Sequence, residues 1–311
     1  MKTTLQALTT AALLLPALSA PASVELYFAD DLSPWPYMNP NQVPRQAYPN
    51  SQAMHALFLS RINGALTESF EECPTWSCPT NLMFGTGTNV AALFWSTNGS
   101  AGDTNASAII SLSDPTNTIA GTFPITGTNF LCFDWNCVYG SNDYCQITFS
   151  TPQAAFGFYA TDLEFNTLSL TFARADGSTT NVVVPFPVYQ GSGAVFYQGV
   201  IDRANPFTSV TITNVGWGNL ADGIAFDDLT IGAQNAIISA APAELQIVED
   251  SQLQIQGTVG AIYRIDFSNV LPATNWVTIV PNFVLTASPY SPTNVIVTSS
   301  PEGFYRAIGI Q

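Results

Sequence analysis

The stretch Asp222-Gly-Ile-Ala-Phe-Asp-Asp-Leu-Thr-Ile231 is a hydrophobic strand interrupted by two adjacent carboxylates. Asp227 and Asp228 stand where a buried strand normally carries Val or Ile. Placing a carboxylate at a sheet surface is costly unless something cationic compensates. No Lys or His lies nearby in the sequence, so a hard metal ion such as Ca²⁺ is the expected partner.

Short β-prone runs separated by Gly, Asn, Asp, Ser and Pro fill the chain from Leu66 to Ile231. Regular turn residues between such runs are typical of an antiparallel sandwich. A stretch of about 165 residues is long enough to form one core of this type. We therefore expect residues 64–232 to form a single β-sandwich.

The beginning of the chain resembles an export signal. Lys2 precedes the largely apolar run Leu8–Leu18, and small residues follow before Ser23. The apolar run is too short to span a bilayer. Residues 1–22 are predicted to be a signal peptide and the mature protein to be secreted, the alternative being an uncleaved N-terminal anchor.

One helix is expected near the N-terminus. Residues 23–63 read as an irregular lead-in that ends in a helix over 51–63, where apolar residues recur at helical spacing. Asn50 or Ser51 is expected to cap this helix, and Asn63-Gly64 to end it.

A second, smaller β unit is expected over residues 243–311, after a small and polar linker at 233–242. Roughly seventy residues is marginal for an independent core. We expect its aromatic side chains to supply most of that core: Tyr263, Phe267, Trp276, Phe304 and Tyr305.

The charge balance excludes several functions. The six arginines, one histidine and absence of lysine after the signal stand against 22 acidic residues. Nucleic acids and anionic membranes bind basic patches, so neither is an expected partner. Lysine-based and multi-histidine chemistry is excluded. His55, between Met54 and Leu57 on the expected helix, is interpreted as a packed or surface residue rather than a member of a catalytic triad.

Five cysteines are disulfide candidates. In an oxidising compartment Cys73 with Cys78 would close a small loop, and two of the other three another. The pairing of these three cannot be derived, and one thiol is left over: Cys132, Cys137 and Cys145. A zinc site is the alternative, but the CxxC spacing is missing.

Two phrases of the sequence resemble one known pattern. Glu68-Ser-Phe-Glu-Glu72 opens the expected sandwich and Gly223-Ile-Ala-Phe-Asp-Asp-Leu229 closes it. MAM domains and jelly-roll carbohydrate-binding modules are similar in opening with Phe-Glu and closing with an Ile-Asp-Asp-like strand. The resemblance implies a jelly-roll-like sandwich whose first and last strands lie side by side, with a structural Ca²⁺ between them. Glu71 and Asp227 would then be metal ligands.

Two further resemblances concern other segments. Ala154-Ala-Phe-Gly-Phe-Tyr-Ala-Thr-Asp-Leu163 is similar to a phrase in exported bacterial proteins of the PEP-CTERM-associated type. The C-terminal unit, with Tyr263-Arg-Ile-Asp-Phe-Ser268 and Phe304-Tyr-Arg306, resembles a small β module of secreted planctomycete and verrucomicrobial proteins. That module implies no activity.

The candidate metal site extends beyond these two ligands. If the terminal strands pair, Glu72 and Asp228 could add carboxylates, and Asp222 sits in the preceding turn. The alternative is that these acids are solvated at a strand end.

A candidate ligand-binding site lies in two aromatic stretches. Trp135, Tyr139 and Tyr144 are interspersed with Asn and Asp, and Trp217 occupies a Gly-Trp-Gly turn. Aromatic faces beside hydrogen-bonding groups suit sugar rings, which have apolar C–H faces edged by hydroxyls. The alternative is that these rings cover the edge of the sandwich.

A hydrolytic pair is also conceivable, because Asp162 and Glu164 are two residues apart and would share one face of a strand. The alternative is that Asp162 caps a turn.

The sequence thus predicts an all-β protein: a jelly-roll-like sandwich, a small second β-sandwich module and one short N-terminal helix. We expect a secreted, non-catalytic binding protein that is stabilised by calcium and binds extracellular glycan, without membrane insertion. The first alternative is a structural or adhesive component of the cell surface. The second is a glycan hydrolase or lyase that uses Asp162, Glu164 or the acids of 222–228.

Overall fold

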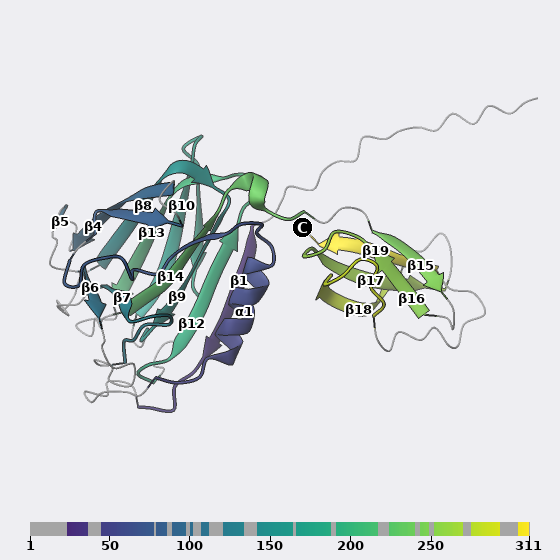
Figure 1. The fold of residues 1–311 in the computed structure, drawn as a ribbon, viewed down its shortest axis with the longest axis horizontal. Helices are drawn as coiled ribbons and strands as arrows, with labels where there is room; N and C mark the ends of the chain where they lie inside the picture. Colours follow the sequence, from purple (N-terminus) through teal and green to yellow (C-terminus); the bar gives the residue numbers. More distant parts are fainter. Residues whose placement is uncertain are drawn as a thin grey trace, which may run out of the picture.

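The structure, a computed structural model, is mostly β, as predicted, with one α-helix among the residues it describes (Figure 1). It describes residues 24–36, 45–77, 79–85, 89–97, 100–101, 107–111, 121–133, 142–163, 166–187, 191–216, 224–239, 243–248, 252–269, 275–292 and 304–310.

The larger module consists of two antiparallel seven-stranded sheets. The first sheet contains, in spatial order, β1 (Glu25–Asp31), β12 (Val195–Ile201), β9 (Ala155–Thr161), β14 (Ile224–Gly232), β7 (Asn129–Phe133) and β6 (Ser107–Ser111), with β2 (Leu66–Glu68) also paired to β14. The second contains β11 (Thr179–Val183), β10 (Asn166–Arg174), β13 (Phe207–Gly216), β8 (Asn142–Gln153), β4 (Asn89–Thr97) and β3 (Asn81–Phe84), with β5 (Ser100–Ala101) paired to β4.

A phenylalanine-rich core joins the two sheets. Phe158 on β9 contacts Phe196 and Phe226, with ring centroids 6.2 and 5.4 Å apart, while Phe156 reaches Phe172 of the second sheet. Every residue of β9, β12 and β14 is buried. These strands are apolar on both faces because one face meets the second sheet and the other is covered from outside.

On the outer face of the first sheet, α1 (Pro49–Leu59) packs against β1 and β12. Phe58 of this helix lies flat against the sheet, where β12 carries Gly199; a Cβ at position 199 would stand 2.6 Å from the Phe58 ring. Tyr27 packs edge-on against the same ring at 5.4 Å. Glycine in the strand therefore lets the helix approach closely.

The helix begins at Pro49 rather than at residue 51, and its cap comes from a distant part of the chain. The Asp31 carboxylate accepts the N–H groups of Asn50 and Ser51 at 3.1 and 2.8 Å, and the Ser51 hydroxyl at 2.7 Å. The expected cap by Asn50 or Ser51 side chains is therefore wrong. Asp31 ends β1, a strand in the segment expected to be irregular, which instead pairs along its whole length with β12.

The segment after the sandwich packs against it over its described part. Asn63 N–H donates to the Ala236 carbonyl and Ile238 N–H to the Arg61 carbonyl, both at 2.8 Å. Ile237 is buried and bridges Ile62. A short 3₁₀ turn, η1 (Gln234–Ala236), precedes it. Hydrogen bonds to Arg61 and Asn63, just after α1, thus hold the first part of the expected linker in place.

The C-terminal module has two small sheets: β15 (Glu244–Val248) with β16 (Gln252–Gln256), and β18 (Val277–Val284), β17 (Ile262–Ser268) and β19 (Phe304–Ile310) with β17 in the centre. Its buried core consists of Ile255, Ala261, Tyr263 and Leu285. Of the aromatic residues expected there, only Tyr263 is buried. Phe267, Trp276, Phe304 and Tyr305 are partly exposed and lie outside the buried core.

In the described part of the chain, no helix has both the length and the apolar character that a membrane crossing requires.

His55 makes the packing of α1 sensitive to acid. Its ring lies 5.0 Å from Tyr159 and 4.9 Å from Tyr197, and its Nε2 is buried without a hydrogen-bond partner. Burial lowers the pKa of His55 to about 4. The unfolded chain, with an ordinary histidine pKa of about 6.5, binds the proton first. The stabilisation is therefore complete above about pH 6.5 and is lost as the pH falls toward 4.

We predict that lowering the pH from 7 to 4.5 reduces the unfolding free energy of the wild type by about 1–2 kcal/mol more than it reduces that of the His55→Leu variant. Urea unfolding followed by tryptophan fluorescence at several pH values measures the difference. Parallel pH profiles for the two proteins would contradict this prediction.

Candidate functional site

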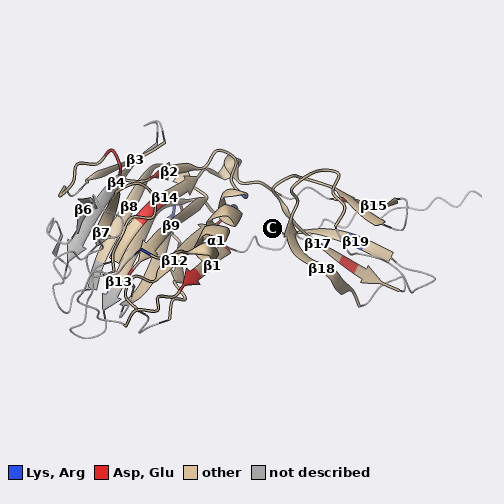
Figure 2. Ribbon diagram, turned by 60° about the horizontal axis from the view of Figure 1, so that its bottom comes forward, with Lys and Arg blue, Asp and Glu red and all other residues tan. Residues whose placement is uncertain are grey.

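The two acids of the closing strand lie where β14 changes its partner. Residues 224–226 pair with β7 and residues 229–231 with β2, while β9 runs along the opposite side. Between the two pairings, the register with β9 shifts after Asp227, and Asp228 has a positive φ of 49°. Asp227 and Asp228 thus form a β-bulge at the junction of three strands. Figure 2 marks acidic residues on β14 and on β1.

Asp227 uses its carboxylate to hold backbone N–H groups. Its Oδ2 accepts from Ile125 at 2.7 Å and from Thr126 at 3.0 Å, and its Oδ1 accepts from Asp228 at 2.7 Å. The residue is 1% exposed. Burial, and after it the charge of Asp228, raises the pKa of Asp227 well above its usual value, although the three N–H donors act in the opposite direction.

Glu71 holds the same segment of chain two residues further on. Its Oε1 accepts N–H groups of Thr128 and Asn129 at 2.8 and 2.7 Å. Asp228 accepts the Thr126 hydroxyl at 2.8 Å. Burial raises the pKa of Asp228, and the Glu71 charge raises it further. Glu71, just after β2, and Asp227 and Asp228, in β14, therefore all accept hydrogen bonds from residues 125–129.

Other elements hold this segment as well. The Tyr48 hydroxyl donates to the Ile125 carbonyl at 3.1 Å, and the Arg45 guanidinium donates to the same oxygen. Phe123 N–H donates to the Thr161 hydroxyl at 3.3 Å. Hydrogen bonds from several elements thus hold residues 121–129 in place.

The strands that carry the two acidic phrases do lie side by side, because Glu68 pairs with Leu229. The oxygens of Glu71 and Asp227, however, face N–H donors, an arrangement that does not fit a shared cation. No group of three or more His, Cys, Asp or Glu side chains suited to a metal occurs among the described residues. Asp222 lies outside them, and calcium binding stays a prediction.

Of the four aromatic candidates, the structure describes Tyr144. Tyr144 lies half-buried in β8, opposite Ser96 and Thr213. Trp135, Tyr139 and Trp217 lie outside the described residues.

The ends of the neighbouring strands are nevertheless paired. Phe133 lies opposite Ile224 in the first sheet, and Asn142 lies opposite Val215 in the second. The described residues that flank the segments 134–141 and 217–223, which carry the three remaining aromatic candidates, are therefore paired with each other in each sheet. These flanking residues lie at one end of the sandwich, which we call the loop end.

Asp162, at the same end, is a structural residue. It is fully buried with a positive φ of 72°, and its Oδ1 accepts the Gly193 N–H at 2.8 Å. This arrangement agrees with the alternative in which Asp162 caps a turn. Glu164 lies outside the described residues. Asp162, Asp227 and Asp228 are all buried, so a polysaccharide cannot contact their carboxylates in this conformation.

No disulfide joins the cysteines within the described ranges. Cys73 and Cys145 have free thiols; burial raises the pKa of Cys73 to about 11 and that of Cys145 further above its usual value. Cys145 faces the core between the sheets, whereas Cys132 belongs to the cluster on the outer face of the first sheet. Cys132 and Cys145 are not joined in the structure, and the disulfide pairing stays a prediction. Cys78 and Cys137 lie outside the described part.

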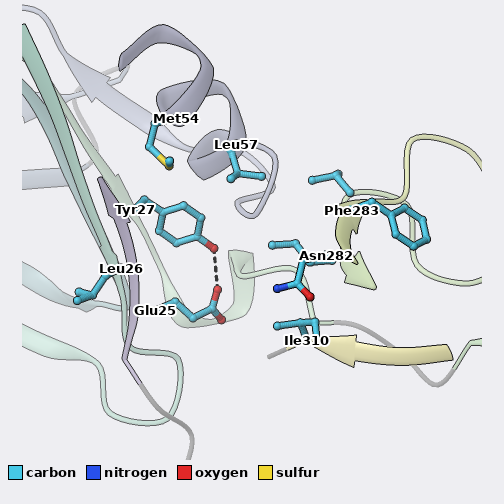
Figure 3. A pocket seen from close by; sticks show the side chains of 10 residues that line it. Glu25, Leu26, Tyr27, Met54, Leu57, Asn282, Phe283 and Ile310 are labelled. Atoms are coloured by element: carbon cyan, nitrogen blue, oxygen red, sulfur yellow. Dashed lines mark hydrogen bonds between the residues drawn. The ribbon is translucent and has the colours of Figure 1, made fainter. Parts of the chain in front are cut away.

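A cavity that no sequence pattern indicated lies between the two modules (Figure 3). It has a volume of about 340 Å³, and its walls come from β1, α1, β18 and the ends of β17 and β19. Tyr27 donates to Glu25 at 2.7 Å at the edge of this cavity. Behind them Arg61 is 1% exposed and lies 3.4 Å from Glu25. The cavity was missed because residues 23–50 read as irregular rather than as a strand with an apolar flank.

Neither a protein-family model nor a curated protein matches this chain. No family match therefore supports the resemblance to PEP-CTERM-associated proteins.

Among solved structures, those similar to this chain include adhesin domains and carbohydrate-binding modules with β-sandwich folds. The K2 cleaved adhesin domain of Lys-gingipain has 14% identity and a TM-score of 0.35, covering 54% of this chain and 99% of that one. The carbohydrate-binding module TmCBM61, in complex with β-1,4-galactotriose, has 14% identity and a TM-score of 0.30, covering 45% and 88%. A xylan-binding domain from CBM 22 has 10% identity and a TM-score of 0.29, covering 55% and 96%. These likenesses concern the fold alone.

We predict that Asp227→Ala destabilises the sandwich by about 2–4 kcal/mol, because it leaves three N–H groups without their acceptor. The melting temperature should fall by roughly 5–10 °C. Differential scanning calorimetry of the mature chain measures it. Glu72→Ala, an exposed acid beside Glu71, is the matched control and should melt like the wild type.

The same experiment tests calcium. If N–H donors alone satisfy the acids, EDTA and added CaCl₂ leave the wild-type melting temperature unchanged. A fall on chelation that matches the effect of Asp227→Ala would show that the acids instead share a divalent cation.

Proposed function

We propose that this protein is a secreted, non-catalytic binding protein that takes extracellular glycan at the loop end of its larger sandwich. The observation that carries the proposal is the pairing of Phe133 with Ile224 and of Asn142 with Val215. This pairing brings together the described residues next to the two aromatic segments of the sequence, 134–141 and 217–223. Aromatic rings among Asn and Asp side chains provide both stacking faces and hydrogen bonds for a sugar.

The scaffold under the loop end supports this role. The strands that lead into it belong to two fully packed sheets, and Asp162 fixes the turn after β9 through Gly193. Binding residues on loops are effective when rigid elements position them. The protein therefore has a stable base from which the two aromatic segments can present a recognition surface.

The charge of the chain indicates the kind of glycan. The formal net charge is −15 at pH 7, so a polyanionic polysaccharide would be repelled. Neutral glycans carry no such penalty. The panel to test therefore consists of neutral polymers and oligosaccharides, including xylan and β-1,4-galactotriose, the ligands named for two of the similar structures.

We predict that Trp135→Ala and Trp217→Ala each weaken glycan binding by about tenfold, since one stacked aromatic ring contributes on the order of 1 kcal/mol or more. A glycan array identifies the ligand, and isothermal titration calorimetry on the mature chain gives the affinity. Trp76→Ala is the matched control, because Trp76 is 60% exposed on the segment after β2. Its affinity should equal that of the wild type.

An unchanged affinity in both loop-end variants would overturn the proposed site. An array without any bound glycan, together with adhesion to protein-coated surfaces, would favour the adhesive alternative.

A further inference from the structure

A second candidate binding site lies in the C-terminal module, in a groove between its two small sheets. β15 and β16 form one wall, and β19 with the residue before β18 forms the other. The volume is about 340 Å³. β15 and β19 are neighbours in space but belong to different sheets. The groove is therefore an opening between two sheet edges.

Aromatic rings line this groove. Trp276, Phe304 and Tyr305 all contribute, together with Gln246 and the exposed Ile247. Such rings normally fill a core, above all in a module of this size. Here Ile255, Ala261, Tyr263 and Leu285 form the core instead. The module thus keeps three aromatic side chains partly exposed at one place.

The rings are held in fixed positions. The Arg306 guanidinium carbon lies 4.2 Å from the Trp276 ring centroid, so it stacks on the indole. Arg306 in turn donates to Asp266 at 3.0 and 3.2 Å, and Asp266 is 2% exposed. Tyr305 lies 5.1 Å from the Phe267 ring. A site whose side chains are already ordered loses less entropy when it binds a ligand.

The lining determines the class of ligand. None of the residues that line the groove is charged, although the chain is strongly acidic. Gln246 supplies an amide, whose Nε2 donates to Glu244 at 3.2 Å. The occupant must therefore be uncharged, with an apolar face for the rings and polar edges for the amide. A pyranose ring of a neutral glycan has this character, whereas a charged peptide does not.

We propose that the groove of Gln246, Trp276, Phe304 and Tyr305 is a binding site for neutral sugar units. This site extends the glycan-binding role proposed above but uses none of the loop-end residues. A chain with two such sites binds a polymeric glycan bivalently, and its affinity for the polymer exceeds that of either site alone.

The test uses the full mature chain labelled with 5-fluorotryptophan, and the Trp276 resonance is assigned from its absence in Trp276→Phe. The probes are β-1,4-linked tetrasaccharides of glucose, xylose, mannose and galactose. We expect one of them to shift the Trp276 signal. In calorimetry, Trp276→Ala should weaken binding at this site at least tenfold, reducing the stoichiometry from two to one, while Trp276→Phe retains part of the affinity.

Val277→Ala is the matched control, because Val277 is the next residue, is 62% exposed and does not line the groove. Its sugar binding and melting temperature should equal those of the wild type. Gln246→Ala, a change at an exposed strand position, tests the site without altering an aromatic contact and should also weaken binding.

The inference is overturned if no tetrasaccharide shifts the Trp276 signal, if Val277→Ala has the same effect as Trp276→Ala, or if only a charged peptide shifts the signal. The Trp135→Ala/Trp217→Ala double variant separates the two proposals. Continued tetrasaccharide binding at Trp276 in that variant supports the groove whatever happens at the loop end. Loss at the groove with an intact loop end leaves the proposed function standing.

Discussion

The larger module depends on the way one carboxylate satisfies backbone donors at the place where β14 changes partners. A strand that leaves β7 and joins β2 opens a gap in the ladder of its sheet. Buried N–H groups in such a gap are expensive unless they find acceptors. Asp227 supplies acceptors for three of them from the bulge itself, and Glu71 supplies two more from beyond the neighbouring strand. The acids thus close the sheet rather than interrupt it.

This closure gives the acids of the larger module a structural role. Asp162, Asp227 and Asp228 are buried in hydrogen bonds, whereas in the C-terminal module partly exposed aromatic residues line a groove between two sheet edges. A rigid framework with recognition confined to its rims can accept new segments without losing its core.

Much of the architecture could be predicted from the sequence, because turn residues between short apolar runs indicate antiparallel strands whatever their order. The pairing of the strands that carry Glu68 and Leu229 followed from a family resemblance. The partners of Asp227 could not be predicted, since two of its three donors lie about a hundred residues away and all three are backbone groups, which leave no mark on side-chain patterns. β1 was missed for a similar reason: its polar and aromatic residues form a strand only because β12 pairs with them. Trp276 was expected in a core because its side chain is large and apolar. Residue type alone does not reveal that Ile255, Ala261, Tyr263 and Leu285 form that core instead.

The cap of α1 has a consequence for how the protein is made. The first N–H groups of this helix are satisfied by Asp31, and Asp31 is held in place by a strand that pairs with Val195–Ile201. A helix of eleven residues without a local cap is marginal by itself in water. During synthesis the N-terminal elements must therefore wait until the ribosome has passed Ile201 before they can settle. The N-terminal strand and helix are therefore among the last elements of the larger module to become ordered.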